Sequence, residues 1–415
     1  MAKADACGGI FSRRSFMGMA AGTAAAAALG LAGCAGGGGD DGSADADDEW
    51  DGVTFETTQQ ERDLWGSAEA CEVRVGLVMG PPSMGLSQFM VAAQNGLTEN
   101  DFAFTVVGMD YVTAVAQFNS GDYDICTLPS NIGPILYNNE DLKSDYRVIN
   151  ITNLGVLYVL TTDPDLAELS DLAGRTVYSY GESGTPEYTT TALMKKLGLD
   201  GTFNLEFKSS PLEVVNMLQE VDGCVAILPQ PFVTLAQLLV DDLYVPIDLT
   251  TEWDAAFADT GSQAVTATTI VRLEFLEEHE QAVVEYLNMA AESVAWTLEN
   301  IEEAAALQES LDTFLNNEVA QAAMPYLSLV CLTGEEMRTA LAGFLRELYE
   351  ADPESIGGAM PGEDFYYLPP AGELDERYLQ AGLEEALNRA SATEGDDGSA
   401  TKEDAEAALE AFAAS

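Results

Sequence analysis

Hydrogen-bonding and aromatic side chains follow two apolar runs that stand about one hundred residues apart in the sequence. The segment ICTLPSN ends on Ser130 and Asn131, and the segment VAILPQPF ends on Gln230 and Phe232. A third stretch, YGESGTPEY at 180–188, places glycines and hydroxyl groups between a strand-like run and a helix-like run. Hydroxyl, amide and ring groups arranged in this way can orient a small organic molecule by hydrogen bonds and stacking. The chemistry that these residues predict is therefore recognition of a solute.

The sequence does not supply a complete catalytic set. Its single histidine, His279, lies in the acidic helix-like run LEFLEEHEQAVVEYL, and we expect it at the surface. Without a histidine beside a serine or cysteine, no nucleophile and base can be paired. The YGESGTPEY loop lacks the Gly-Lys-Ser/Thr of a phosphate-binding loop, and Glu182 and Glu187 would repel a phosphate. We therefore predict that the protein is not an enzyme and carries no cofactor.

The six cysteines predict neither a metal site nor a defined disulfide. Cys7 and Cys34 lie in the N-terminal region, and the other four are far apart with no Cys-x-x-Cys pair. Because no His/Cys cluster is present, we predict no bound metal. Buried free thiols are expected at Cys71, Cys126, Cys224 and Cys331.

The elements that must position these residues form a repeated pattern of strands and helices. Each unit reads strand, helix, strand, helix, strand, which predicts a parallel sheet. Gly80 corresponds to Gly181, and Leu128-Pro129 corresponds to Leu228-Pro229, so we predict two similar α/β lobes. We expect Thr185 to cap the helix that follows 180–184, with Pro186 at its first position.

Ligands of open parallel sheets sit at the carboxyl ends of the strands. If the two lobes face each other, the turns PPSMG, LPSN, GESGTPEY and LPQPF converge on one cleft. We expect free backbone N–H groups of the GESGTPEY loop to contribute to the site. The predicted ligand-binding residues are Ser83, Met84, Asp110, Ser130, Asn131, Tyr158, Gly184, Thr185, Glu187, Tyr188, Gln230 and Phe232.

The charge balance limits the possible partners. The 415 residues include 17 basic and 70 acidic side chains, a formal net charge of −53. Such a surface repels nucleic acid and anionic lipid, so a nucleic-acid partner is excluded. We therefore expect the partner to be a small molecule.

The N-terminus predicts export and lipid attachment. Residues 1–34 carry the adjacent Arg13 and Arg14 and then an alanine-rich apolar run, which is typical of a twin-arginine export signal. The run is too short, and too rich in Gly and Ala, for a transmembrane helix. Residues 31–34, LAGC, resemble a bacterial lipobox, which makes Cys34 the lipid-bearing first residue. These features predict a protein anchored to the outer face of the bacterial cytoplasmic membrane.

The two ends of the chain outside the repeated units are predicted to be extensions. Residues 35–70 begin with an acidic, glycine-rich stretch that has almost nothing to bury, and we interpret them as a flexible tether. Residues 351–415 form a C-terminal extension, partly disordered, in which 371–391 has helical spacing suited to packing on the first lobe. We expect the last dozen residues to form a marginal helix.

Taken in order, the lipoprotein signal and the segments DYDICTLPSN, DLAGRTVYSYGESGTPEY and DGCVAILPQPF resemble the substrate-binding lipoproteins of ABC importers. More narrowly they resemble the SsuA-like branch, which binds sulfonates, nitrate, taurine or thiamine precursors. Arg175 stands at the position where the family usually has lysine, and GGAMPGEDFYY at 357–367 resembles the end of a subset of these proteins.

The resemblance implies an α/β fold of the type II periplasmic-binding-protein kind, with two Rossmann-like lobes, a central cleft and a two-strand hinge. Lobe one would comprise 71–160 and 250–350, and lobe two 161–249, with crossings at 150–162 and 241–253. The implied partners are a small-molecule ligand and the permease and ATPase subunits of an importer, with the protein itself a monomer.

Charge gives the one indication of ligand class. The predicted turns contain Asp110 and Glu187 but no arginine, and Lys208 is the nearest candidate cation. Because a sulfonate or nitrate needs basic groups or many N–H donors, we favour a neutral or cationic ligand, such as a thiamine-precursor-like pyrimidine, over a sulfonate. Two alternatives stay open: a thiamine-pyrimidine-synthesis enzyme of the same superfamily, and a surface receptor without transport.

Overall fold

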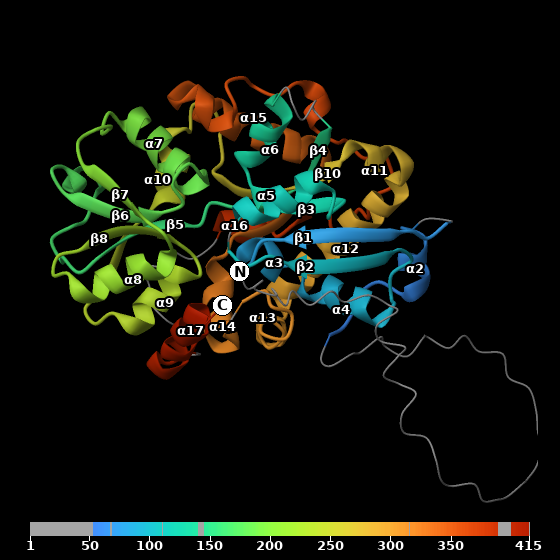
Figure 1. Ribbon diagram of the computed structural model, residues 1–415, viewed down its shortest axis with the longest axis horizontal. Helices are drawn as coiled ribbons and strands as arrows, with labels where there is room; N and C mark the ends of the chain where they lie inside the picture. Colours follow the sequence, from blue (N-terminus) through green and yellow to red (C-terminus); the bar gives the residue numbers. More distant parts are fainter. Residues whose placement is uncertain are drawn as a thin grey trace, which may run out of the picture.

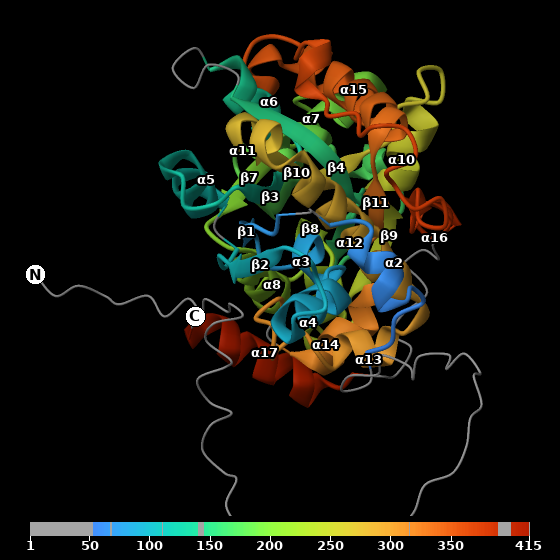
Figure 2. The same ribbon diagram turned by 90° about the vertical axis from the view of Figure 1, so that its right-hand side faces the viewer.

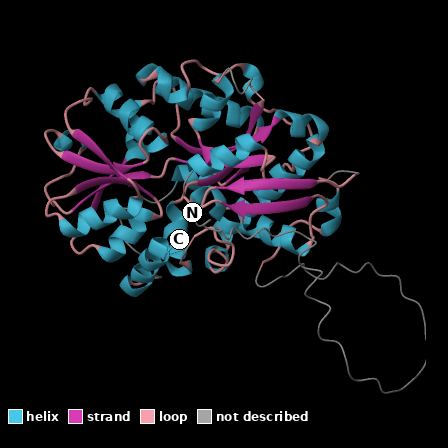
Figure 3. Ribbon diagram, in the orientation of Figure 1, coloured by secondary structure: helices cyan, strands magenta, loops and turns pink. Residues whose placement is uncertain are grey.

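Two sheets of different size divide the molecule into two lobes, and helices cover both faces of each sheet (Figures 1 and 3). We call the lobe built on the seven-stranded sheet the large lobe, and the lobe built on the five-stranded sheet the small lobe. The computed structural model describes residues 53–66, 69–109, 111–139, 145–314, 316–388 and 400–414.

The large lobe is built from both ends of the chain. Its first part contains α2 (Gln59–Asp63), β1 (Glu72–Leu77), α3 (Pro81–Met84), α4 (Ser87–Asn95), β2 (Asp101–Val106), α5 (Tyr111–Ser120), β3 (Ile125–Pro129), α6 (Ile132–Asn138) and β4 (Tyr146–Leu154). Its second part contains β10 (Val265–Arg272), α11 (Leu273–Glu278), α12 (Glu280–Glu299), α13 (Ile301–Ala305), α14 (Asn317–Ala323), β11 (Leu329–Leu332), α15 (Gly334–Ala351), β12 (Gln380–Ala381) and α16 (Leu383–Asn388). Short 3-10 turns are η2 (Met324–Tyr326), η3 (Pro353–Ile356) and η4 (Glu363–Phe365).

The small lobe is inserted between these two parts. It contains β5 (Leu157–Thr161), η1 (Leu169–Leu172), β6 (Thr176–Tyr180), α7 (Thr185–Leu197), β7 (Asn204–Lys208), α8 (Pro211–Glu220), β8 (Val225–Pro229), α9 (Phe232–Leu239), β9 (Tyr244–Asp248) and α10 (Leu249–Ala256). A last helix, α17 (Lys402–Ala414), contacts α14 of the large lobe and α9 of the small lobe.

The two lobes share one topology, as the sequence repeat predicts. In the large lobe β1 pairs in parallel with β2 and β3, and in the small lobe β6 pairs in parallel with β7 and β8. Each three-stranded unit is then extended by an antiparallel strand, β10 beside β3 and β5 beside β8. The orders β2-β1-β3-β10 and β7-β6-β8-β5 are therefore equivalent.

Glycines stop equivalent helices at equivalent points of the two lobes. Gly96 ends α4 and Gly198 ends α7, and both have φ of 70°. A residue in this left-handed conformation closes the last helical turn, and glycine takes it without a steric penalty. Gly80 and Gly181, which follow the first strand of each unit, also have positive φ, of 111° and 79°. Gly80 and Gly181 thus allow tight βα turns in both lobes, and Gly96 and Gly198 end the helices that follow.

A hydrophobic core fills the space between sheet and helices in each lobe. In the large lobe the Phe89 ring lies 4.9 Å from Phe102, 5.0 Å from Phe104 and 5.6 Å from Tyr286, in edge-to-face contacts. Tyr286 belongs to α12, which is buried over most of its length against the sheet. These aromatic contacts fix α4 and α12 on the sheet and so hold the strand ends in place.

The predicted tether is too long by at least fourteen residues. From Val53 to Gly66 the chain packs on the large lobe, with Val53 and Arg62 fully buried. The Thr57 N–H and hydroxyl donate to the buried carboxylate of Glu292 in α12 at 2.6 to 3.0 Å. The hydrophilic composition of 35–51 does not extend to these residues, so the prediction of a tether up to residue 70 is wrong.

Three further boundaries differ from the expectation. The small lobe begins at Leu157, where β5 starts, and it still includes α10, which contacts α7 and β5. The return to the large lobe therefore lies between α10 and β10, later than the predicted crossing at 241–253. Residues 352–388 are part of the large lobe, since β12 pairs with β11 and Tyr366 bridges to Val148. The predicted signal at 1–34 and the disorder expected around 389–399 lie outside the described residues.

Among the residues that the structure describes, no helix is long and apolar enough to span a membrane. Cys71, Cys126, Cys224 and Cys331 are free thiols, and all but the half-exposed Cys71 are buried. Burial raises the pKa of Cys224 to about 11 and that of Cys331 to about 12. These groups stay protonated and belong to the core.

Candidate functional site

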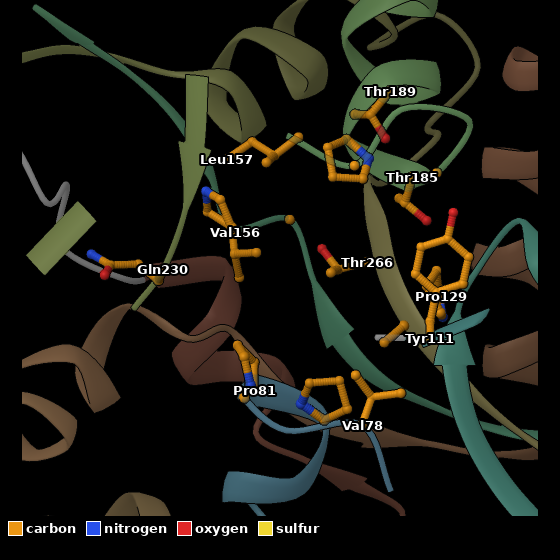
Figure 4. Close-up of a pocket in the computed structure, with 18 of the residues that line it drawn as sticks. Val78, Pro81, Tyr111, Pro129, Val156, Leu157, Thr185, Thr189, Gln230 and Thr266 are labelled. Carbon is orange, nitrogen blue, oxygen red and sulfur yellow. The ribbon is translucent and has the colours of Figure 1, made fainter. Parts of the chain in front are cut away.

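A cavity of about 130 Å³ lies between the two lobes, at the carboxyl ends of their parallel strands (Figure 4). The large lobe contributes Val78, Met79, Gly80, Pro81, Pro82, Met109, Tyr111, Leu128, Pro129, Ala264, Val265, Thr266, Ala267 and Phe314. The small lobe and the crossing strand contribute Gly155, Val156, Leu157, Tyr180, Gly181, Gly184, Thr185, Pro186, Thr189, Pro229, Gln230, Phe232, Leu249 and Thr250.

The repeated Leu-Pro segments form facing walls of this cavity, as predicted. β3 ends at Pro129 and β8 ends at Pro229, and both prolines line the cavity from opposite lobes. In Figure 4 the labelled residues of the small lobe, Thr185 and Thr189, face Val78 and Pro81 of the large lobe. The predicted convergence of four turns on one cleft is therefore confirmed.

The crossing between the lobes forms the floor of the cavity. β4 ends at Leu154, and after Gly155 and Val156 the chain enters β5 of the small lobe. Gly155 is required here, because a Cβ atom would overlap the side chain of Thr250 at the start of α10. The Thr266 hydroxyl donates to Leu154 O at 2.7 Å and ties β10 to the same crossing. Because this crossing connects the lobes, a rotation of one lobe relative to the other must change the backbone conformation at the crossing.

Four of the predicted residues line the cavity: Gly184, Thr185, Gln230 and Phe232. The Phe232 ring lies 6.5 Å from that of Tyr180, in edge-to-face geometry. Gln230 is fully buried, and its Oε1 accepts from Thr234 N and Oγ1 at 3.2 and 3.0 Å. Its Nε2 has no hydrogen-bond partner among the described residues.

Ser130 and Asn131 instead hold the lobes together. The Thr185 hydroxyl of the small lobe donates to Asn131 Oδ1 of the large lobe at 3.0 Å and lies 3.4 Å from Ser130 Oγ. Ser130 Oγ also donates to Val265 O at 2.6 Å, and all three residues are buried. These contacts join residues more than fifty positions apart and close the cleft beside the cavity.

Thr185 is not the cap of the helix that follows the loop. α7 begins at Thr185 itself, its cap is Gly184, and no side chain bonds the cap. The prediction of a Thr185 cap is wrong, because the helix starts one residue earlier than expected and Thr185 is its first helical residue. The Thr185 hydroxyl donates across the cleft to Asn131 instead.

Several of the backbone donors expected in the GESGTPEY loop are occupied by acceptors within the loop. Ser183 N donates to the Glu187 carboxylate at 2.6 Å, and Gly184 N donates to Gly181 O at 3.0 Å. Pro186 has no N–H to offer. A carboxylate of the protein itself therefore already accepts one of the N–H groups before this helix start.

The equivalent turn of the large lobe is equally poor in donors. Pro81 and Pro82 carry no N–H, and Gly80 N donates to Thr313 O at 3.0 Å. Ser83 N and Oγ both bond back to Gly80 O. The proline residues and these internal hydrogen bonds reduce the number of N–H groups that the two turns offer to a negatively charged ligand.

The other predicted residues lie outside the cavity lining. Ser83, Met84 and Tyr158 are fully buried in the large-lobe turn and the cores, and Tyr188, on α7, is partly buried against the core. Asp110, Cys34, Arg13 and Arg14 lie outside the described residues, and their predicted roles stay predictions.

The cavity is uncharged along its whole described lining, which contains no Asp, Glu, Lys, Arg or His. Lys208, the cation nearest in sequence, bonds Glu206 at 2.7 Å and lies over the Tyr178 ring. Burial, and then the neighbouring Tyr111, raise the pKa of Tyr180 to about 12, so this phenol is neutral at physiological pH. The interior is thus apolar, with hydroxyl and amide groups as its polar atoms.

Several lining residues were not predicted. Val156 and Leu157 belong to the crossing, whose position was predicted but whose side chains were not assigned to the site. Tyr111 begins α5, and Thr266 lies on β10, an antiparallel strand outside the predicted strand-helix units. A crossing strand must pass the cleft between the lobes, so the signal for Val156 was present in the sequence.

Neither a metal centre nor a histidine lies at the cavity. Among the described residues, no group of three or more His, Cys, Asp or Glu side chains could hold a metal ion. His279 joins α11 to α12 and stacks on Phe275, with ring centroids 5.0 Å apart. It is half-buried on the large lobe and does not line the cavity.

This arrangement of two α/β lobes around a central cleft is the fold of the periplasmic binding proteins, and the predicted fold class is confirmed. No protein-family model and no curated protein matches the sequence. Among solved structures, an ABC transporter protein from Parabacteroides distasonis has 18% identity and a TM-score of 0.58, over 72% of this chain and 99% of that one.

Two sulfonate-binding proteins are similar to a comparable degree. The periplasmic aliphatic sulphonate binding protein SsuA from Escherichia coli has 13% identity and a TM-score of 0.57, over 72% of this chain and 92% of its own. A putative sulfonate ABC transporter protein, SsuA from Methylobacillus flagellatus, has 12% identity and a TM-score of 0.54, over 73% and 93%. At these identities the likeness concerns the fold.

Proposed function

We propose that this protein is the extracytoplasmic solute-binding component of an ABC importer, which captures a small organic solute between its lobes and delivers it to a permease. The observation that carries the proposal is the cavity at the strand ends, closed by the bond from Thr185 to Asn131 across the cleft. Burial of a solute by two hinged lobes produces a closed shape that a membrane partner can distinguish from the open one.

The chemistry of the cavity favours a neutral or cationic ligand over a sulfonate. A sulfonate keeps its charge at every physiological pH, and burying that charge without cations or N–H donors is very costly. The described lining has no cation, and the turns at both helix starts contain prolines and several N–H groups that are already bonded within the protein. The anionic ligands named for the SsuA proteins from Escherichia coli and Methylobacillus flagellatus are therefore not proposed for this chain.

The size of the cavity favours a single ring. A cavity of about 150 Å³ in a protein core holds benzene, and this one has about 130 Å³. The buried Gln230 Nε2 and Thr189 Oγ1, which have no partner among the described residues, are available to polar atoms of such a ring. A thiamine-precursor-like pyrimidine satisfies all three properties: small size, absence of negative charge and a few polar atoms. Asp110 remains the proposed contact for an amino group of the ligand.

The proposed location follows from the N-terminal sequence. Export through the twin-arginine signal at Arg13 and Arg14 and lipid attachment at Cys34 would hold the two lobes at the outer face of the cytoplasmic membrane. There a monomer could release its solute directly to the permease subunits. We propose no catalytic step, since the cavity lining described above contains no acid, base or nucleophile set.

A binding panel tests the proposal. Titration calorimetry of the protein, freed of solute by dialysis against denaturant and refolded, would compare an aminopyrimidine, its alcohol derivative and an alkanesulfonate. We expect micromolar or tighter affinity for a pyrimidine and no heat from the sulfonate. Tight binding of the sulfonate would overturn the ligand assignment, and turnover of any bound compound by the purified protein would overturn the transport role.

A further inference from the structure

The C-terminal helix α17 lies across the junction of the two lobes, beside α14 of the large lobe and α9 of the small lobe. Figures 1 and 2 both place it along the lower edge of the molecule, next to α14. Nothing in the two-lobed topology requires this helix, since both sheets are complete without it. Its position therefore calls for an explanation of its own.

One aromatic side chain of α17 joins the two walls of the cavity. The Phe412 ring lies 5.7 Å from Phe232 and 5.4 Å from Phe314, centroid to centroid. Phe232 belongs to the small lobe and Phe314 to the large lobe, and both line the cavity. Phe412 is itself buried. It is therefore packed behind the cavity, against a ring from each side.

The rest of α17 has the form of a helix made for docking. Ala405 and Ala408 are fully buried and stand with Phe412 on one face, at spacings of three and four residues. The exposed positions include Glu403, Glu406 and Glu410. The small alanines let the helix approach α9 and α14 closely. Its start is fixed by a reciprocal bond pair, in which Thr401 N donates to Asp404 Oδ2 and Asp404 N donates to Thr401 Oγ1.

We propose that α17 is a strap that docks across the cleft only when the lobes are closed, and that it holds the closed form over a bound solute. When the lobes separate, Phe232 and Phe314 move apart and Phe412 keeps at most one of its two ring partners. A helix of 13 residues is marginal in water without tertiary contacts. Docking of α17 and closure of the lobes therefore stabilise each other, and by linkage the coupling is reciprocal.

The strap has a consequence for solute exchange. Because Phe412 packs against two lining rings, it restrains the wall through which the lobes must part. Release of a solute would require α17 to leave the surface first, and a permease that displaces α17 would open the cleft. This consequence depends on the proposed transport role, whereas the strap itself does not.

The test uses the full chain without any solute, so its failure is distinguishable from a failure of the proposed function. Nitroxide labels on the exposed Val112 and Val221, one in each lobe, report the distance between the lobes. Hydrogen exchange of α17 peptides reports docking of the strap. The variants are F412A, the surface control E410Q and a truncation after residue 399.

We expect F412A and the truncation to lengthen the mean label distance, while E410Q leaves it at the wild-type value. In the reverse direction, T185V, which removes the bond between the lobes, should raise the exchange rate of α17 amides about tenfold. The proposal is overturned if F412A and the truncation leave the label distance unchanged, or if α17 exchange in T185V equals that of the wild type. A truncated chain that keeps a wild-type melting curve but opens its lobes supports it most directly.

Discussion

The hydrogen bond from Thr185 to Asn131 joins the two lobes, so its removal is the most direct test of lobe closure. In the closed form both groups are buried, and Asn131 Oδ1 receives this donor at 3.0 Å. Replacing Thr185 with valine keeps the shape of the side chain but leaves the Asn131 oxygen buried without its donor. In the open form water can solvate that oxygen, so the change penalises closure and leaves the open form unaffected.

The magnitude follows from the cost of a buried acceptor that has lost its hydrogen bond. That cost is about 1–3 kcal/mol. We therefore expect T185V to lower the ratio of closed to open molecules by about 5- to 150-fold. Each lobe keeps its own core, so the melting temperature of T185V should stay within a few degrees of the wild type.

Thr189 provides a matched control on the same helix. It is buried and lines the same cavity, but its hydroxyl has no hydrogen-bond partner among the described residues. T189V makes the same chemical change without removing a bond between the lobes. Pulsed electron resonance between labels on Val112 and Val221 would compare the two variants in solute-free protein, with the half-exposed Cys71 replaced by serine. We expect a longer mean distance in T185V alone. Equal distances in T185V and T189V would refute the reasoning.

Three further predictions concern the cavity, the crossing and the buried carboxylates. V156W should fill the cavity and lower solute affinity by more than about 100-fold, measured by calorimetry. G155A should destabilise the protein by about 1–3 kcal/mol in denaturant unfolding, through overlap with Thr250, and T250A should restore most of the loss. Burial raises the pKa of Glu285 and Glu292 above 4.5, so the folded state binds more protons than the unfolded state just above that pH, and stability falls as pH rises. The double variant E285Q/E292Q should show a smaller fall in unfolding free energy between pH 4.5 and 7.

Each of these has a control or an outcome that contradicts it. V112W places the same bulk at an exposed site and should bind solute normally, so equal losses in both variants would contradict the cavity assignment. If T250A does not rescue G155A, the overlap at the crossing is not the cause of the destabilisation. If E285Q/E292Q follows the wild-type pH profile, other acidic groups of this strongly acidic chain govern the dependence.

The fold followed from the sequence because its signals are local and repeated. Apolar strands, helix-ending glycines and the two Leu-Pro segments recur at the same spacing. Each of these signals determines the secondary structure of the few residues around it. The N-terminal segment could not be predicted in this way. Thr57 is held in place by hydrogen bonds to Glu292, which lies 235 residues further along the chain, and no local sequence pattern predicts that contact.

The sequence predicted the correct turns for the site. Within or next to these turns, several predicted residues are sequence neighbours of the residues that line the cavity. Tyr158 was expected in the cavity, yet Leu157 lines it, because adjacent residues of a strand point to opposite faces. A one-residue uncertainty along a strand is enough to exchange core and cavity positions. On α7, Tyr188 was expected in the cavity, yet Thr189 lines it, because Thr189 lies one helical turn after Thr185 on the same face. Phe412 escaped prediction entirely, since its role depends on rings from two distant segments.

The bound solute itself gives the most direct test of the central claim. Protein purified gently from the cells that make it would be examined by native mass spectrometry, and the released compound would be identified by its fragments. The account predicts one equivalent of a neutral or cationic compound about the size of a single ring, absent from V156W. Recovery of a sulfonate or another anion from the wild-type cleft would contradict it.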